Sequence, residues 1–127
     1  MDKKPSSTIV LVIDGDPAVR NALKFSLEVE GFHVRTYANA AEILGEGALA
    51  RRGYLVIDDK LPDRSGMALL TELRRAGCQL SAILIATNPT RALRSMAASA
   101  RVRVIEKPLL TDELFEAIRE GGTLAQD

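Results

Sequence analysis

Two carboxylates, a hydroxyl and an ammonium group each follow a separate apolar stretch of this chain. In chain order they are Asp14, Asp58, Thr87 and Lys107. Carboxylates that are brought together repel one another, so they hold their protons more tightly unless a cation is present. Mg²⁺ fits such a place, because it is a hard ion that takes oxygen ligands and keeps several waters. The set therefore predicts a magnesium site, provided that the fold gathers these residues.

A carboxylate in such a site can attack phosphorus and form an acyl phosphate. Asp58 is the favoured nucleophile, because it ends the most central of the expected strands. The metal and Lys107 would neutralise charge on the phosphoryl oxygens, and Thr87 would donate a hydrogen bond to one of them. The predicted metal ligands are Asp14, Asp58 and the backbone carbonyl of Lys60.

Five apolar stretches of strand length alternate with amphipathic segments. The expected strands are 8–13, 33–37, 54–57, 82–86 and 102–105. A helix is expected after each, and this alternation predicts an α/β fold with a five-stranded parallel sheet, doubly wound, with helices on both faces. Ligands of such sheets bind beyond the carboxyl ends of the strands. The four chemical side chains are therefore expected at one edge.

Capping signals mark the starts of the expected helices. Asp16-Pro17 predicts an N-cap followed by proline at the first helical position. Asn39, with a glutamate three residues later, predicts a capping box. Asn88-Pro89 predicts another cap with a first-turn proline, opening a helix through about residue 98.

Length and composition fit one domain of ordinary globular character. The chain has 127 residues, of which 46% are hydrophobic and 27% charged. Seventeen basic and seventeen acidic residues leave no net field that would recruit nucleic acid. One cysteine and no long apolar run predict a cytoplasmic location without a membrane span. The expected domain is 1–127, with a core of about 8–120 and a tail or linker start at 121–127.

These residues resemble the receiver domain of two-component response regulators, in particular the receivers of alphaproteobacterial nitrogen-fixation regulators. The motifs that carry the resemblance are Val12-Ile13-Asp14, Leu55-Val56-Ile57-Asp58 with Leu61-Pro62-Asp63-Arg64-Ser65-Gly66, Ile85-Ala86-Thr87, and Ile105-Glu106-Lys107-Pro108. They stand in the family's order over nearly the whole chain. The resemblance implies a flavodoxin-like receiver fold with strand order 2-1-3-4-5.

The resemblance also implies a function. A bacterial histidine kinase or phosphotransfer protein would pass a phosphoryl group to Asp58 in a phosphorelay that depends on Mg²⁺. The signal would leave through the face formed by the fourth helix, the fifth strand and the fifth helix, where a homodimer partner or an effector binds. The domain would catalyse only its own phosphorylation and dephosphorylation, and it would bind neither membrane nor nucleic acid.

The chain departs from the family pattern at several positions. Gly15 stands where receivers usually carry a second acid, and Asp16 follows one residue later. Asp16 is a candidate metal ligand, directly or through water, but a role as helix cap alone is favoured. Val104 stands where the family usually has an aromatic ring that rotates on activation. Asp59 adds a charge beside Asp58, where most members have an apolar residue.

Two alternatives remain open from the sequence. A receiver-like docking module that works without phosphorylation would explain Gly15 and Val104. A phosphatase of the haloacid-dehalogenase type would use Asp14 as nucleophile, since Asp14-Gly15-Asp16 resembles that family's Asp-x-Asp signature. Against the phosphatase, the other acidic pair precedes Thr87 instead of following the lysine, and no insertion is long enough for a cap domain.

Overall fold

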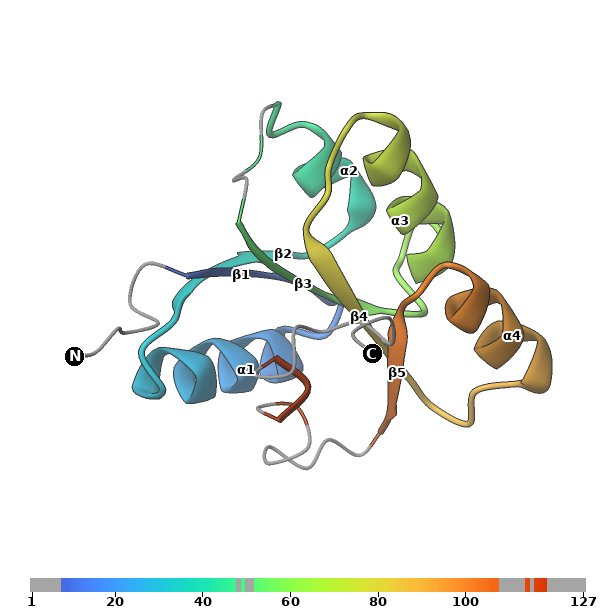
Figure 1. The fold of residues 1–127 in the computed structure, drawn as a ribbon. Coiled ribbons are helices and arrows are strands. Elements are labelled where there is room, and N and C mark those ends of the chain that lie inside the picture. The colour runs from blue at the N-terminus through green and yellow to red at the C-terminus, as the bar shows by residue number, and fades with distance from the viewer. Residues whose placement is uncertain (1–7, 48, 50–51, 108–113, 115, 119–127) are drawn as a thin grey trace.

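Five parallel strands form one sheet in the order β2-β1-β3-β4-β5 (Figure 1). The computed structural model describes residues 8–47, 49, 52–107, 114 and 116–118. The strands are β1 Ile9–Ile13, β2 His33–Tyr37, β3 Gly53–Asp58, β4 Ser81–Ala86 and β5 Arg103–Glu106. The α/β class and the strand order that the resemblance implied are both confirmed.

The helices alternate with the strands and cover both faces of the sheet. They are α1 Pro17–Val29, α2 Ala40–Leu44, α3 Gly66–Arg75 and α4 Arg91–Ser99. Leu114 and residues 116–118 are helical where the fifth helix was expected, whereas its expected start at Thr111 lies outside the described residues. Within the described ranges, no helix is long and apolar enough to cross a membrane.

Two clusters of buried side chains separate the faces. On one face, Leu11, Leu55 and Ile57 pack with side chains from α2, α3 and α4. On the other face, Val10 and Val56 pack with α1 and with Leu114, Ala117 and Ile118. Figure 1 shows α1 on the opposite side of the sheet from α2 and α3. Because successive side chains of a strand point to opposite faces, a continuous apolar run supplies both clusters.

Two of the predicted caps are confirmed. Asp16 precedes α1, where its side chain accepts a hydrogen bond from the Ala18 N–H and Pro17 is the first helical residue. Asn39 caps α2 by accepting from the Glu42 N–H. Each cap fixes the direction in which the chain leaves the carboxyl edge of the sheet.

The predicted cap of the fourth helix is wrong. Asn88 has φ +48°, a left-handed conformation, whereas an N-cap residue is normally extended. The chain turns at Asn88 and Pro89 before Thr90, whose side chain accepts from the Leu93 N–H and caps α4. The Asn-Pro signal marked a turn, and the hydroxyl two residues later supplies the cap.

Candidate functional site

Asp14 and Asp58 lie next to each other at the carboxyl edge of the sheet. Asp58 is the last residue of β3, and Asp14 follows β1, which pairs with β3. They are the buried charged residues of the described chain, with 2% and 9% of their surfaces exposed. Lys107 Nζ lies 3.2 Å from Asp58 Oδ1 and 4.0 Å from Asp14 Oδ2. The fold thus brings three of the four predicted chemical residues together.

Asp14 is held by the loop that follows it. Its Oδ1 accepts from the Asp16 N–H at 2.9 Å, and its backbone carbonyl accepts from Arg20 Nη1 at 2.8 Å. Its Oδ2 is buried without a hydrogen-bond partner. Burial raises the pKa of Asp14; the Asp58 charge adds to the rise, whereas the Asp16 N–H and Lys107 oppose it. A buried carboxylate oxygen with no donor favours a bound cation.

The acids present fit a hydrated Mg²⁺. Asp16 is exposed and its Oδ1 accepts from the Ala18 N–H at 2.9 Å, so the cap interpretation of this residue is confirmed. In the described part of the chain, no three acidic, histidine or cysteine side chains gather as a metal cluster. Mg²⁺ is commonly bound through one or two carboxylates while it keeps several waters. Asp14 and Asp58 are two carboxylates of this kind.

Gly15 is tightly covered by a proline. A Cβ atom added at Gly15 would lie 3.0 Å from Cδ and 3.1 Å from Cγ of Pro62. Such a separation is tighter than ordinary van der Waals contact, so a side chain at position 15 would press against the ring. Pro62 therefore covers the position at which receivers usually carry their second acid.

The β3–α3 loop, residues 59–65, is closed by backbone hydrogen bonds. The Asp59 N–H donates to Ile85 O at 2.8 Å, and the Gly66 N–H donates to Asp59 O at 2.7 Å. Lys60 and Ser65 form an isolated β-bridge between these ends. A Cβ at Gly66 would lie 2.6 Å from the carbonyl oxygen of Asp58, so glycine is required for the close return of the chain.

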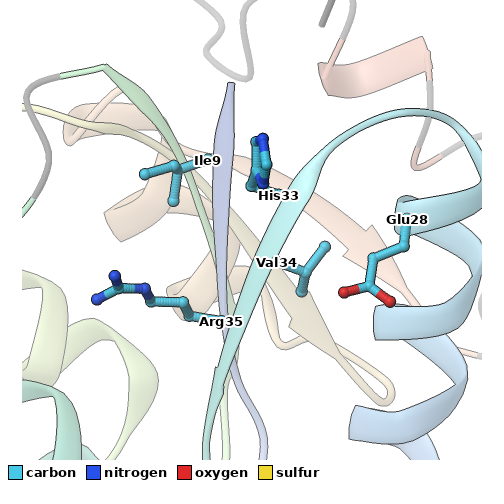
Figure 2. Close-up of a pocket in the computed structure, with 5 residues that line it drawn as sticks. All are labelled: Ile9, Glu28, His33, Val34 and Arg35. Atoms are coloured by element: carbon cyan, nitrogen blue, oxygen red, sulfur yellow. The ribbon is translucent and has the colours of Figure 1, made fainter. Parts of the chain in front are cut away.

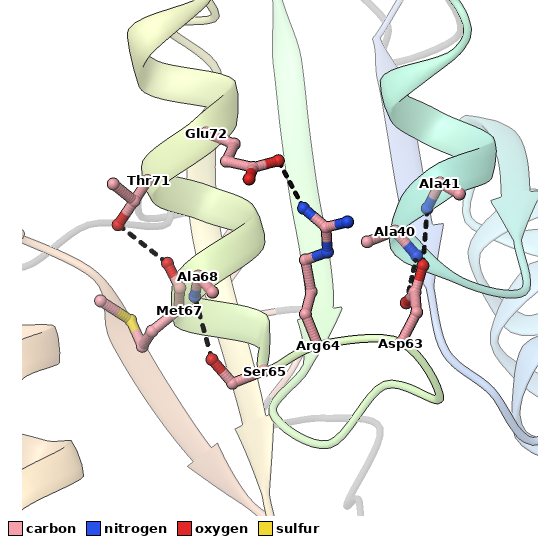
Figure 3. A network of polar contacts seen from close by, with 9 residues as sticks. All are labelled: Ala40, Ala41, Asp63, Arg64, Ser65, Met67, Ala68, Thr71 and Glu72. Atoms are coloured by element: carbon pink, nitrogen blue, oxygen red, sulfur yellow. Dashed lines mark hydrogen bonds and ion pairs between the residues drawn. The ribbon is translucent and has the colours of Figure 1, made fainter.

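Asp63 ties this loop to α2 (Figure 3). Its Oδ1 accepts from the Ala40 N–H and its Oδ2 from the Ala41 N–H, each at 3.0 Å. The Ala40 bond above all holds the pKa of Asp63 below its usual value. In the sequence, Asp63 stands within the Leu61–Gly66 motif, and nothing in that motif indicates a role for it. Its hydrogen-bond partners are backbone N–H groups at the start of α2, and no pattern of side chains in the sequence indicates such partners.

Thr87 lies at the same edge but outside the contacts of the other three residues. It follows β4 directly, and the Lys107 N–H donates to Ala86 O at 2.8 Å, which sets the backbones of the two loops side by side. The Thr87 side chain is exposed and makes no hydrogen bond with any other described residue. The next residue, Asn88, takes the left-handed turn.

Val104 packs from β5 against the cluster under α2, α3 and α4, and it is partly buried. Nearby, Arg94 Nη2 of α4 lies 3.5 Å from Glu106 Oε1 of β5. A small aliphatic side chain thus stands beside a solvent-exposed ion pair on the expected output face.

A separate pocket lies at the other end of β1 from Asp14 (Figure 2). It is an open hollow of about 440 Å³, and its lining residues are Ile9, Glu28, His33, Val34 and Arg35. None of the predicted site residues lines it. The predicted site residues lie at the carboxyl edge, away from this pocket.

Comparison with a protein-family model shows which protein family has this arrangement of site residues. The model for the response regulator receiver domain matches residues 10–119. The chain belongs to this family. Membership favours the receiver interpretation over a phosphatase in which Asp14 is the nucleophile. Receiver domains are generally not catalytic enzymes, and they generally bind Mg²⁺ at the acidic pocket.

The relatives of this receiver domain include two transcriptional regulatory proteins named FixJ. It is 35% identical over 117 residues to the transcriptional regulatory protein FixJ of Azorhizobium caulinodans, covering 91% of this chain and 55% of that protein. It is 34% identical over 115 residues to FixJ of Rhizobium meliloti, covering 89% and 56%. The chain therefore spans about half the length of these curated relatives.

Solved structures agree with the receiver fold. A CheY-like receiver domain protein from Methanospirillum hungatei has a TM-score of 0.80 at 28% identity, covering 89% of this chain and 91% of that one. The FixJ N-terminal structure has a TM-score of 0.79 at 32% identity, covering 88% and 90%. Receiver domains of response regulators partner with histidine kinases or phosphotransfer proteins in two-component signalling.

Proposed function

We propose that this receiver domain accepts a phosphoryl group on Asp58 from a histidine kinase or phosphotransfer protein, with Mg²⁺ bound at Asp14, Asp58 and the Lys60 carbonyl. One observation carries the proposal: Lys107 Nζ lies 3.2 Å from Asp58 Oδ1 and 4.0 Å from Asp14 Oδ2, an oxygen that is buried without a hydrogen-bond partner. A nucleophilic oxygen, an ammonium group and a carboxylate oxygen that could bind a metal ion then lie within one cluster, of which Asp14 and Asp58 are buried.

The transfer is a displacement at phosphorus. An Asp58 carboxylate oxygen forms a bond to phosphorus while the bond from phosphorus to the donor's imidazole nitrogen breaks and its electron pair returns to that nitrogen. Bound Mg²⁺ supplies positive charge that neutralises the phosphoryl oxygens. Lys107 turns from the free carboxylate to a phosphoryl oxygen, which keeps its ammonium group paired in both states.

Thr87 completes the site only after phosphorylation. In the free domain its hydroxyl is exposed and without a described partner, so it is available to donate to a phosphoryl oxygen. That movement would carry the start of α4 and alter the face of α4, β5 and the following helix. With Val104 in place of a rotating ring, the exposed Arg94–Glu106 pair is one link between α4 and β5 that can respond. A homodimer partner or an effector would read this face.

One relative supports the metal-dependent interpretation. The response regulator protein TrrA from Thermotoga maritima was solved in complex with Mg²⁺–BeF, and it matches with a TM-score of 0.75 at 26% identity, covering 88% of this chain and 96% of that one. A cytoplasmic location fits the same role.

A second candidate is a docking module that works without phosphorylation. The close cover of Gly15 by Pro62 favours it, because the second acid is missing and its position is packed over. The intact cluster of Asp14, Asp58 and Lys107 weighs against it, since a buried pair of acids costs stability that a docking surface does not need.

Intact-mass analysis after incubation with acetyl phosphate, with and without Mg²⁺, separates these candidates. Wild type is expected to gain one phosphoryl mass only with Mg²⁺, and Asp58→Asn is expected to gain none. Asp59→Asn is the matched control, because it removes the neighbouring acid and is expected to leave the adduct intact. An adduct retained in Asp58→Asn would contradict the proposal, and no adduct with acetyl phosphate or a phosphorylated histidine kinase would favour the docking module.

A further inference from the structure

Two caps converge on the start of α2, and they come from different parts of the chain. The first turn of a helix leaves its N–H groups without partners inside the helix. Asn39, directly before α2, accepts from the Glu42 N–H at 2.9 Å. Asp63 reaches from the β3–α3 loop, more than twenty residues away, to accept from Ala40 and Ala41. The second cap is therefore also a tether between α2 and the loop that follows Asp58.

The tether residue, Asp63, lies at the tip of the β3–α3 loop. Its two ends are fixed by the Asp59 and Gly66 backbone bonds, and the Leu61 N–H donates to Arg64 O at 3.2 Å. At the tip, Pro62 lies over Gly15, where it would meet an added Cβ, while Asp63 bonds to α2. Figure 3 shows the Asp63 carboxylate turned toward the start of α2 and away from α3. Adjacent residues thus dock one loop on two other segments of the carboxyl edge.

We propose that Asp63 is a positioning residue of the phosphoacceptor site: its bonds to α2 hold the β3–α3 loop against Gly15 and thereby fix the Lys60 carbonyl as a metal ligand. The inference rests on the proposed function, because the carbonyl matters only where Mg²⁺ binds.

Because the second acid is missing, the Lys60 carbonyl is an unusually important ligand of the proposed magnesium site. With Gly15 at that position, Asp14 and Asp58 are the two carboxylates of the cluster, so a third protein oxygen supplies a large share of the coordination. Mg²⁺ requires near-ideal octahedral geometry. Residues that hold a ligand in place change metal affinity by about 10- to 100-fold when they are removed. Loss of the Asp63 tether should therefore weaken Mg²⁺ binding without removing any ligand.

The decisive comparison is between Asp63→Ala and Asn39→Ala. Both variants remove a cap of α2, so both are expected to lower the melting temperature by similar amounts. Only Asp63→Ala frees the loop, so only this variant is expected to raise the Mg²⁺ dissociation constant, by about tenfold or more, in isothermal titration calorimetry. Asn39→Ala is expected to stay within about twofold of wild type. Asp63→Asn, which keeps one carbonyl oxygen as acceptor, is expected to fall between wild type and Asp63→Ala.

Four outcomes would overturn the inference. Equal weakening of Mg²⁺ binding in Asp63→Ala and Asn39→Ala would show that Asp63 acts only as a helix cap. Unchanged Mg²⁺ binding in both variants would show the same. If Asp63→Ala does not fold, wild-type affinity in Asp63→Asn together with faster amide exchange at Ala40 and Ala41 would overturn it as well. A wild type that binds no Mg²⁺ would also remove it.

The proposed function fails separately. A wild type that binds Mg²⁺ yet gains no phosphoryl mass on Asp58 from acetyl phosphate or a phosphorylated kinase would contradict that function. The affinity difference between Asp63→Ala and Asn39→Ala would still support a positioning role for Asp63 in the metal site.

Discussion

Two neighbouring loops at the carboxyl edge are held in opposite ways. The β3–α3 loop is closed by backbone bonds and is tied by Asp63 to α2. The β4–α4 loop, residues 87–90, presents Thr87 to solvent and turns through Asn88 at φ +48°. Thr87 makes no side-chain hydrogen bond with the rest of the described chain, although Thr90 caps α4.

The difference separates two tasks of one site. Under the proposed function, the groups that must be ready before the phosphoryl group arrives are the nucleophile and the metal ligands, which would lie on or beside the fixed loop. The group proposed to respond afterwards, the Thr87 hydroxyl, lies on the loop with few restraints. Preorganised charge lowers the barrier to transfer, whereas a change of conformation needs an element with two accessible arrangements. The predictions below test this division.

The largest effect is expected at Gly66. Gly66→Ala would place a Cβ 2.6 Å from Asp58 O and 2.8 Å from Leu84 Cδ1, so the fixed loop must move. We expect the free energy of unfolding to fall by about 3 kcal/mol in urea titrations. Gly45→Ala is the control, because its Cβ would meet its nearest atom at 3.4 Å, an ordinary contact. A loss below about 1 kcal/mol in Gly66→Ala would contradict the fixed-loop description.

Asp14→Asn is expected to stabilise the free domain. Burial raises the pKa of Asp14 above the ordinary aspartate value of 3.8, so the folded state holds this proton more tightly than the unfolded state does. Wild-type stability therefore falls as the pH rises from 3.8 through the raised pKa. We expect Asp14→Asn to gain about 1 kcal/mol at pH 7, with a gain that shrinks as the pH is lowered toward 4, in urea titrations without Mg²⁺. A destabilised variant at pH 7 would show that the Asp14 charge is compensated in the fold.

Asn88→Gly tests strain in the less restrained loop. Glycine adopts positive φ without the steric penalty of a side chain, and asparagine tolerates it better than most residues. We expect a gain of about 0.5 kcal/mol or less in thermal unfolding. Arg101→Gly is the matched comparison, since Arg101 has φ +61° after α4, and there we expect about 1 kcal/mol. A larger gain at Asn88 than at Arg101 would indicate strain stored beside the site.

Thr87→Ala is expected to have the smallest effect on the free domain. Its side chain is exposed and has no described hydrogen-bond partner, so the change in unfolding free energy should stay within about 0.5 kcal/mol. Thermal unfolding of the phosphorylated form should then separate wild type from the variant, because the hydroxyl is used only there. A loss of unfolding free energy above about 1 kcal/mol in the unphosphorylated variant would show that Thr87 already belongs to the fixed part of the site.

The sequence was informative where local chemistry decides the structure. Continuous apolar runs predicted strands buried on both faces, and Asp16 and Asn39 predicted their helix starts. Because the carboxyl ends of parallel strands lie at one edge of the sheet, Asp14, Asp58 and Lys107 were predicted to lie together there. The N-cap prediction at Asn88 was wrong because a left-handed turn and an N-cap favour the same residue types.

Contacts between distant segments could not be predicted in this way. The bond partners of Asp63 are backbone N–H groups of α2, and backbone groups leave no residue-type signal. The cover of Gly15 by Pro62 depends on how two loops dock, although glycine in place of an acid was noticed. Both features arise from the packing of the edge as a whole.

Amide hydrogen exchange on wild type, before and after phosphorylation by acetyl phosphate with Mg²⁺, tests the central claim most directly. Exchange should be slow in residues 59–66 in both states, while residues 87–90 should exchange fast at first and slow markedly once Asp58 carries the phosphoryl group. Fast exchange in residues 59–66 of the free domain would contradict the account. Unchanged exchange in residues 87–90 of the phosphorylated domain would contradict it equally.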